Sequence, residues 1–282
     1  MTNPIEMLGP RRTQSKIITD PEEIKKVDEE LSRMYDEQKR QEEEKKKRGK
    51  GKPDVKKQNP SNPVQPVASA NAPNINDFEY IPTAGIYFAK RRTHLGKNWN
   101  KTHQLLSQQK IVIPNVGERT LRMPTIEEFR RALAYFKNSQ NSELLQLYNE
   151  ITEVRNSWRG NWLDAYFEKK KDGLYLLTSN KIKSEKLETC LMENKTPGIS
   201  LEQWIDRKNV TRQGIPSENI KIDDNGLWYS HPVDGRIARF YVGYLNSDIK
   251  CDRGPSPGSS NLGVFGVADL ETFKENVEKL IG

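Results

Sequence analysis

The chain has 282 residues, of which 30% are charged and 34% are apolar, so it is polar for a globular protein and long enough for one or two domains. Its two cysteines, Cys190 and Cys251, are too few for a disulfide framework or an all-cysteine metal site. No apolar run approaches the ~20 residues of a membrane span, and the first residues lack the apolar core of a signal peptide. We therefore expect a cytoplasmic protein.

The net charge of +7 comes from one stretch of the chain. Residues 45–57, KKKRGKGKPDVKK, contain eight basic residues and one acid, and the rest of the chain is neutral. A run of this kind is typical of a solvated linker. The alternative is a weak, nonspecific contact with nucleic acid or anionic lipid through residues 45–57.

The N-terminal part predicts a charged helix followed by a linker. Asp20 and Pro21 mark the start of a helix over residues 20–48, and its apolar positions last only two heptads. This pattern favours a lone helix, with self-association as the alternative. Residues 49–77 are rich in Pro, Asn, Ser and Lys, which cannot bury enough apolar surface to fold. We expect a flexible tail over residues 1–77 and a globular domain over 78–282.

The first elements of that domain are expected to be two short strands within 78–93 and helices near 98–109, 125–137 and 142–151. The helix after Pro124 has the clearest signal. Thr125 and Glu128 form a T-x-x-E capping box, and Phe129, Leu133 and Phe136 share one face.

The second half of the domain predicts strands with glycine-marked turns. Lys171-Asp172-Gly173 is expected to join strands at 162–167 and 174–178, and Ser200 is expected to cap a short helix at 199–205. Asp223-Asp224-Asn225-Gly226 favours a hairpin turn over a Ca²⁺ loop, because it lacks the alternating acids and the distal Glu. Helices that come early and a β-rich C-terminus indicate an α+β fold.

No catalytic, metal or cofactor motif is evident in the sequence. His94, His103 and His231 have no partner at metal-ligand spacing, and HExxH, P-loop and GxGxxG motifs are absent. We therefore predict no catalytic residue, no metal and no cofactor. Cys251 is expected to be buried rather than to act as a nucleophile.

Glu150, Glu153 and Asp164 bracket a tryptophan-rich segment with Trp158 and Trp162. A paired-carboxylate glycosidase is conceivable there, but acids at this density are usually surface charges. The five tryptophans fit core packing better than a stacking platform for nucleic-acid bases, because no basic groove accompanies them.

Residues 236–254, RIARFYVGYLNSDIKCDRG, alternate with a period of two, which indicates two half-buried strands around a turn at Asn246-Ser247. One set is apolar or aromatic: Ala238, Phe240, Val242, Tyr244, Ile249 and Cys251. The other set is expected to point away from the core: Arg239, Tyr241, Gly243, Leu245, Asp248, Lys250 and Asp252. Aromatic, charged and small residues mixed in this way resemble a paratope more than a solubilising surface.

We expect the loop that follows to continue this surface. The next strand is expected to place Leu262 and Val264 inward and Phe265 outward. The additional candidate ligand-binding residues are Gly254, Ser256, Gly258 and Phe265. The alternative is an ordinary sheet whose face is half covered by another element.

The domain resembles C-type-lectin-fold proteins of the formylglycine-generating-enzyme and sulfatase-modifying type. The helix start Met123-Pro124-Thr125 with Glu128-Phe129 is similar to the entry into a core helix in that family. Within the family the chain looks most like archaeal or viral variable proteins of diversity-generating retroelements, over residues 78–270. The segments that carry this resemblance are Ala238-Arg239-Phe240, Cys251-Asp252-Arg253 with Pro255, and Leu262-Gly263-Val264 leading to Val267.

The resemblance implies a C-type-lectin-like domain whose last strands present a diversifiable surface to a protein or another surface ligand. The catalytic cysteine pair of the formylglycine-generating enzymes is not reproduced, so their oxidase activity is not expected. The alternatives are a nucleic-acid-associated protein that uses residues 45–57 and a divergent enzyme on the same fold.

Overall fold

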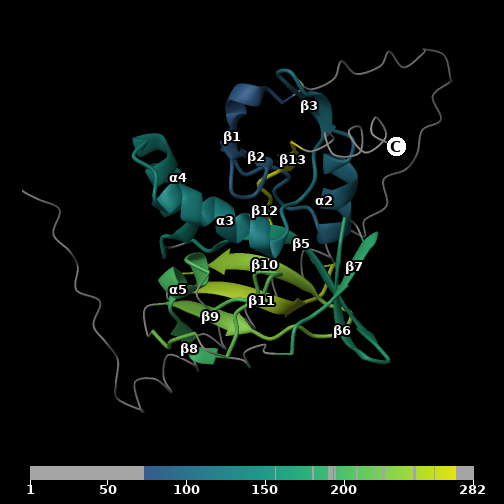
Figure 1. Ribbon diagram of the computed structural model, residues 1–282, viewed down its shortest axis with the longest axis vertical. Helices are drawn as coiled ribbons and strands as arrows, with labels where there is room; N and C mark the ends of the chain where they lie inside the picture. Colours follow the sequence, from purple (N-terminus) through teal and green to yellow (C-terminus); the bar gives the residue numbers. More distant parts are fainter. Residues whose placement is uncertain are drawn as a thin grey trace, which may run out of the picture. The chain divides into compact units, whose positions relative to one another are not determined.

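The computed structural model describes residues 73–270, apart from residues 156, 180, 190–192, 194, 208, 219, 224–225, 244–245 and 257. All described residues belong to one compact unit, and the fold is α+β, as predicted (Figure 1). The charged helix at 20–48, the basic run at 45–57 and Cys190 lie outside the described residues. No helix in the described ranges is both long and apolar enough to cross a membrane.

A small sheet joins the beginning and the end of the described chain. A 3-10 helix, η1 (Ile75–Asp77), leads into the hairpin of β1 (Phe78–Ile81) and β2 (Ile86–Ala89), so the folded part begins a few residues earlier than predicted. Gly85 adopts a φ of +67° in the hairpin turn, a conformation that favours glycine. The late strand β13 (Val267–Asp269) pairs with β2, and the order of the sheet is β1-β2-β13.

The large sheet has eight strands. Seven of them follow the order β7-β6-β5-β10-β11-β9-β8, and the short β12 pairs in parallel with β5. Their bounds are β5 Arg159–Lys170, β6 Gly173–Thr178, β7 Lys183–Lys186, β8 Lys195–Ile199, β9 Leu227–Ser230, β10 Ile237–Val242, β11 Ser247–Arg253 and β12 Leu262–Gly263. The pairs β5–β6 and β10–β11 are antiparallel, as expected for the predicted hairpins, and β5 also pairs antiparallel with β10. A separate two-stranded sheet consists of β3 Lys110–Ile113 and β4 Gly117–Thr120.

The helices begin close to the predicted positions, and the two predicted capping residues, Thr125 and Ser200, precede α3 and α5. Their bounds are α2 Trp99–Leu106, α3 Ile126–Lys137, α4 Ser142–Thr152 and α5 Leu201–Ile205. The capping box of Thr125 and Glu128 is present at the start of α3, and the Ser200 hydroxyl accepts a hydrogen bond at the start of α5. These contacts satisfy backbone N–H groups that have no partner within the helix.

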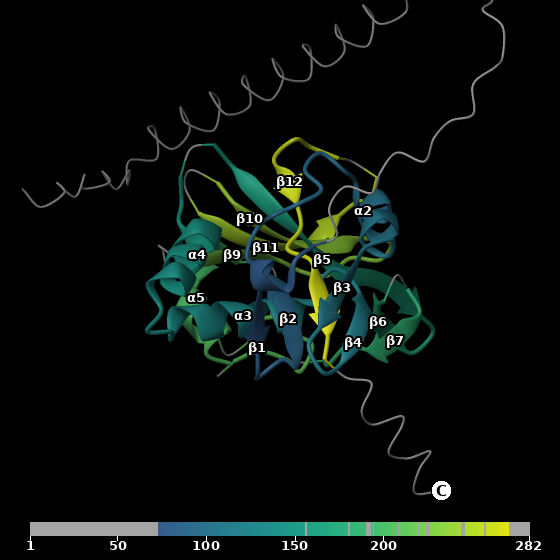
Figure 2. The ribbon, with the colours of Figure 1, turned by 90° about the horizontal axis from the view of Figure 1, so that it is seen from above.

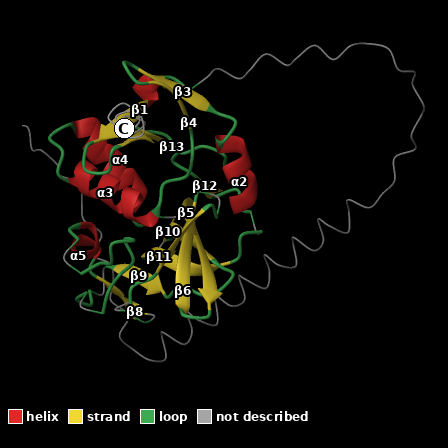
Figure 3. Cartoon of the chain, turned by 45° about the vertical axis from the view of Figure 1, so that its right-hand side comes forward, coloured by secondary structure: helices red, strands yellow, loops and turns green. Residues whose placement is uncertain are grey.

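The two faces of the large sheet contact different apolar clusters. Ala238, Phe240 and Val242 of β10 pack into the larger cluster with buried side chains of α3, α4 and α5. Ile237 points to the opposite face and packs into a smaller cluster with Trp99 of α2. Figures 2 and 3 show α2 well separated from α3 and α4. The alternation predicted for residues 238–242 is therefore correct, because each face has its own packing partners.

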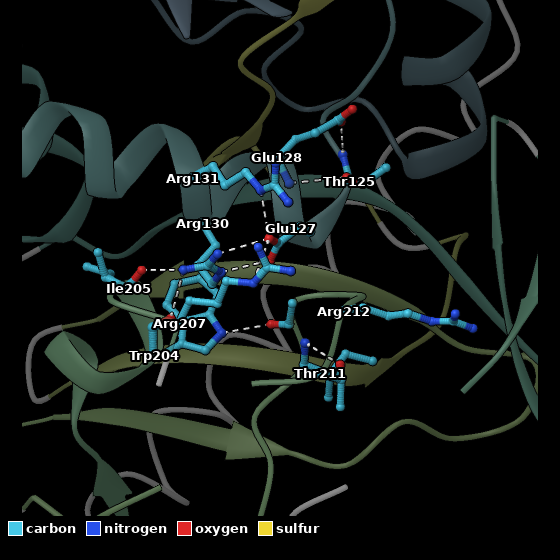
Figure 4. A network of polar contacts seen from close by, with 12 residues as sticks. Thr125, Glu127, Glu128, Arg130, Arg131, Trp204, Ile205, Arg207, Thr211 and Arg212 are labelled. Atoms are coloured by element: carbon cyan, nitrogen blue, oxygen red, sulfur yellow. Dashed lines mark hydrogen bonds and ion pairs between the residues drawn. The ribbon is translucent and has the colours of Figure 1, made fainter. Parts of the chain in front are cut away.

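A polar network fixes α3 against α5 (Figure 4). Glu127 accepts from Arg130 and Arg131 at 2.8 and 2.7 Å, and the guanidinium of Arg207 lies 3.9 Å away. The buried Arg130 also donates to the backbone carbonyl of Ile205 at the end of α5. This network provides hydrogen-bond acceptors for the buried guanidinium of Arg130 and holds α3 against α5.

Candidate ligand-binding face

Four of the predicted binding residues lie together on one face of the large sheet. In the ladder between β10 and β11, Tyr241 is paired with Asp248 and Arg239 with Lys250. Directly paired residues of neighbouring strands project from the same side of a sheet. This side is opposite to the one that buries Phe240 and Val242, and we call it the outer face.

A β-bulge in β11 adds an arginine to the outer face. The register shifts between Ile237 and Arg239, so that Ile237 is paired with Arg253 rather than with Asp252. An extra residue on one strand reverses the alternation beyond it. Arg253 therefore shares the face of Arg239, whereas Asp252 is exposed at the bulge.

The centre of the outer face is aromatic. The half-exposed ring of Tyr241 lies 5.2 Å from the ring of Trp158, measured between centroids. The guanidinium of Arg239 lies 5.2 Å and the ammonium of Lys250 5.6 Å from the same tyrosine ring. A Cβ atom at Gly243 would lie 3.1 Å from the tyrosine ring, so the glycine leaves room for this ring position. Together these groups form a patch of two aromatic rings flanked by cations.

Charges on the outer face are poorly hydrated. Asp248 is only 3% exposed, and burial raises its pKa to about 6 although Lys250 and Arg239 oppose the shift. Its carboxylate accepts a hydrogen bond from Asn246 at 2.7 Å and lies 3.5 Å from the ammonium of Lys250. Burial and the nearby Arg253 lower the pKa of Arg239 to about 10. Desolvated charges of this kind are more common at binding sites than on solubilising surfaces.

The predicted loop residues lie elsewhere. Gly254 is half-buried, and Ser256 and Gly258 are exposed. A Cβ at Gly258 would lie 2.8 Å from the carbonyl oxygen of Gly96, so this loop packs against the segment that precedes α2. Among the described residues, no hydrogen bond, ion pair or ring contact joins these three residues to the patch, and Leu245 lies outside the described residues.

Phe265 was predicted to point outward, and this prediction is wrong. It is 4% exposed rather than outward-facing, and its ring stacks on Phe88 at a centroid distance of 5.4 Å. Leu262 and Val264 are buried as predicted, but they belong to the smaller cluster, whereas Phe265 belongs to the larger one. The chain passes between the two clusters here, so successive side chains are both buried and alternation no longer indicates exposure.

Three residues of the outer face were not among the predicted ones. Arg253 depends on the bulge, which the sequence does not reveal. Trp158 lies before β5, and only its contact with Tyr241 associates it with the face. Trp228 of β9 is half-exposed and is paired with Asp248. The alternation of Leu227, Trp228 and Tyr229 after the glycine-marked turn could have identified Trp228.

The acids and histidines considered for catalysis are not assembled into a surface site. Asp164 is completely buried, where its carboxylate lies 3.3 Å from His103 Nε2 and accepts from the backbone N–H of Ser179 at 2.7 Å. Glu150 and Glu153, by contrast, are exposed around the end of α4. Within the described ranges, no group of His, Cys, Asp and Glu side chains could hold a metal ion.

Cys251 is fully buried on the core side of β11. Burial raises the pKa of its thiol well above the usual range, which disfavours the reactive thiolate. The predicted packing role of this cysteine agrees with its position.

Comparisons with protein-family models, with curated proteins and with solved structures find no match to this chain. The α+β fold is thus defined by the observed order of helices and strands, and the resemblance to C-type-lectin-like proteins stays a prediction.

Proposed function

We propose that this chain is a non-enzymatic ligand-binding protein of C-type-lectin-like fold, and that its outer face binds a protein ligand. The supporting observation is the half-exposed patch of Trp158, Tyr241, Arg239, Lys250 and Arg253 on the central strands of the large sheet. Aromatic and arginine side chains of this kind dominate the binding free energy of many protein interfaces.

The strands that carry the patch are rigidly supported. The other face of the same strands contributes Phe240 and Ile249, both fully buried, to the larger apolar cluster. Each of β10 and β11 is paired on both sides, so the patch has a fixed backbone. Exposed side chains on such a face can be substituted without removing contacts of the larger apolar cluster, which is the property that the variable proteins of retroelements require.

A selection from a displayed library of random peptides tests this function. The full chain is used as the target, and the selected peptides are measured against Tyr241→Ala and Tyr175→Ala. Tyr175 is a half-buried tyrosine of β6 and serves as the matched control. We expect Tyr241→Ala to weaken binding by about tenfold or more and Tyr175→Ala to leave it unchanged.

The selection would reject the proposal if no peptide were enriched, or if the selected peptides bound Tyr241→Ala as well as the unchanged protein. At the level of the gene, the resemblance predicts a neighbouring reverse transcriptase and a near-identical template repeat of the 3′ coding region.

A further inference from the structure

Two arginines on the outer face have no close ion-pair partner among the described residues. Arg239 and Arg253 are brought to the same side by the bulge, and the charge of each acts on the other. The Nε atoms of both are buried without a hydrogen-bond acceptor among the described residues. No carboxylate in the described part of the chain forms an ion pair with either guanidinium within 4.0 Å.

The nearby Asp248 and Asp252 attract Arg239, but neither forms an ion pair with it within 4.0 Å. Asp248 is directed toward Lys250, at 3.5 Å, and accepts from Asn246. Asp252 is exposed at the bulge. Two like charges that are partly desolvated and have unused donors repel each other, and an anion between them would relieve both penalties. The fork of a guanidinium matches the two oxygens of a carboxylate or a phosphate.

We propose that Arg239 and Arg253 form an oxyanion site that binds an acidic side chain of a peptide ligand. This inference rests on the proposed function, because it names the chemistry that the outer face recognises. The ring of Tyr241 beside Arg239 would contact the apolar part of the same ligand residue or of its neighbour.

A peptide is favoured over a nucleic acid by the charges around the site. Asp248 and Asp252 lie on the same two-stranded segment as the arginines, so acids interrupt the cationic area there. A phosphate backbone needs a continuous track of cations, whereas one carboxylate needs only one pair. An oxyanion on a peptide comes from Asp or Glu, or from a phosphorylated residue, and both sources are included in the test.

The test follows the arginine Hε–Nε resonances of the ¹⁵N-labelled full chain during titration. The probes are a short capped peptide of alternating Glu and Gly, the same peptide with Gln, a phosphoserine version, and an oligothymidylate of equal charge. Arg239→Gln and Arg253→Gln assign the two resonances and serve as binding variants. Arg236→Gln, at an exposed arginine just before β10, is the matched control.

We expect the Glu peptide to shift both resonances saturably and the Gln peptide to leave them unchanged. Arg239→Gln and Arg253→Gln should each weaken binding by about tenfold or more, while Arg236→Gln has no effect. Tighter binding of the phosphoserine peptide would identify phosphate as the preferred oxyanion. A thermal melt of each variant establishes that it is folded.

Two results would overturn the inference in different ways. If the oligothymidylate bound more tightly than every peptide, the occupant would be a nucleic acid. If peptides selected through Tyr241 bound without acidic residues and without shifting the arginine resonances, the binding face would stand and the oxyanion site would not. Failure of the library selection itself would instead reject the proposed function.

Discussion

Replacing Asp248 by Asn should stabilise the protein at neutral and alkaline pH. Burial raises the pKa of this carboxyl from 3.8 to about 6. The folded protein therefore binds a proton between pH 4 and 6 that the unfolded chain has released. Stability contributed by protonated Asp248 is fully present below about pH 4 and is lost as the pH rises through about 6.

The magnitude follows from the shift itself. A difference of about two pKa units, at 1.36 kcal/mol per unit, corresponds to roughly 3 kcal/mol at pH 8. Asn cannot ionise but keeps an oxygen that accepts from Asn246. We therefore expect Asp248→Asn to match the unchanged protein near pH 3.5 and to exceed its free energy of unfolding by up to about 3 kcal/mol at pH 8.

Urea denaturation at a series of pH values between 3.5 and 8 measures this difference. Asp172→Asn is the control, because hydrogen bonds from Lys186 and Tyr175 lower the pKa of that exposed carboxyl. The control should therefore show no gain at high pH. The reasoning is refuted if the difference between Asp248→Asn and the unchanged protein does not vary with pH, or if Asp248→Asn is the less stable at pH 8.

Three other substitutions test the packing. Phe265→Ala should cost about 3–5 kcal/mol in urea denaturation, whereas Tyr241→Ala on the outer face should cost about 1 kcal/mol or less; equal losses would mean that both side chains are core residues. Thr125→Ala should lower stability by about 0.5–2 kcal/mol, and an unchanged melting temperature would mean that the capping box is not needed. Gly226→Ala should give no folded protein, since a Cβ there would lie 1.7 Å from the carbonyl oxygen of Ile199; a native circular dichroism spectrum would contradict this contact.

Local signals predicted the helices and the hairpins. Thr125 and Ser200 mark the starts of two helices because a capping side chain acts within its own turn. The turn before Gly173 and the alternation of residues 238–242 were equally reliable, because both depend on neighbours in the sequence. In the candidate site the same alternation correctly placed Arg239, Tyr241 and Lys250 on one face.

The errors came from contacts between distant parts of the chain. The bulge that turns Arg253 outward forms where β11 meets β10, and nothing in residues 247–253 alone requires it. Phe265 was misplaced because Phe88, its stacking partner, lies in the first hairpin of the domain. Trp158 is outside any strand, so no periodic pattern could associate it with Tyr241.

The pairing of β13 with β2 has a consequence for synthesis of the protein. Val267 is paired with Phe88, and Arg122 binds both Glu128 of α3 and Asp269 of β13. A nascent chain therefore cannot complete the small β1-β2-β13 sheet until nearly the whole domain has left the ribosome. Pairings this distant slow folding and leave apolar edges uncovered in the interval. A chain that ends before Phe265 lacks this ring as well as the contacts of β13, so only products that extend through β13 would present an intact binding face.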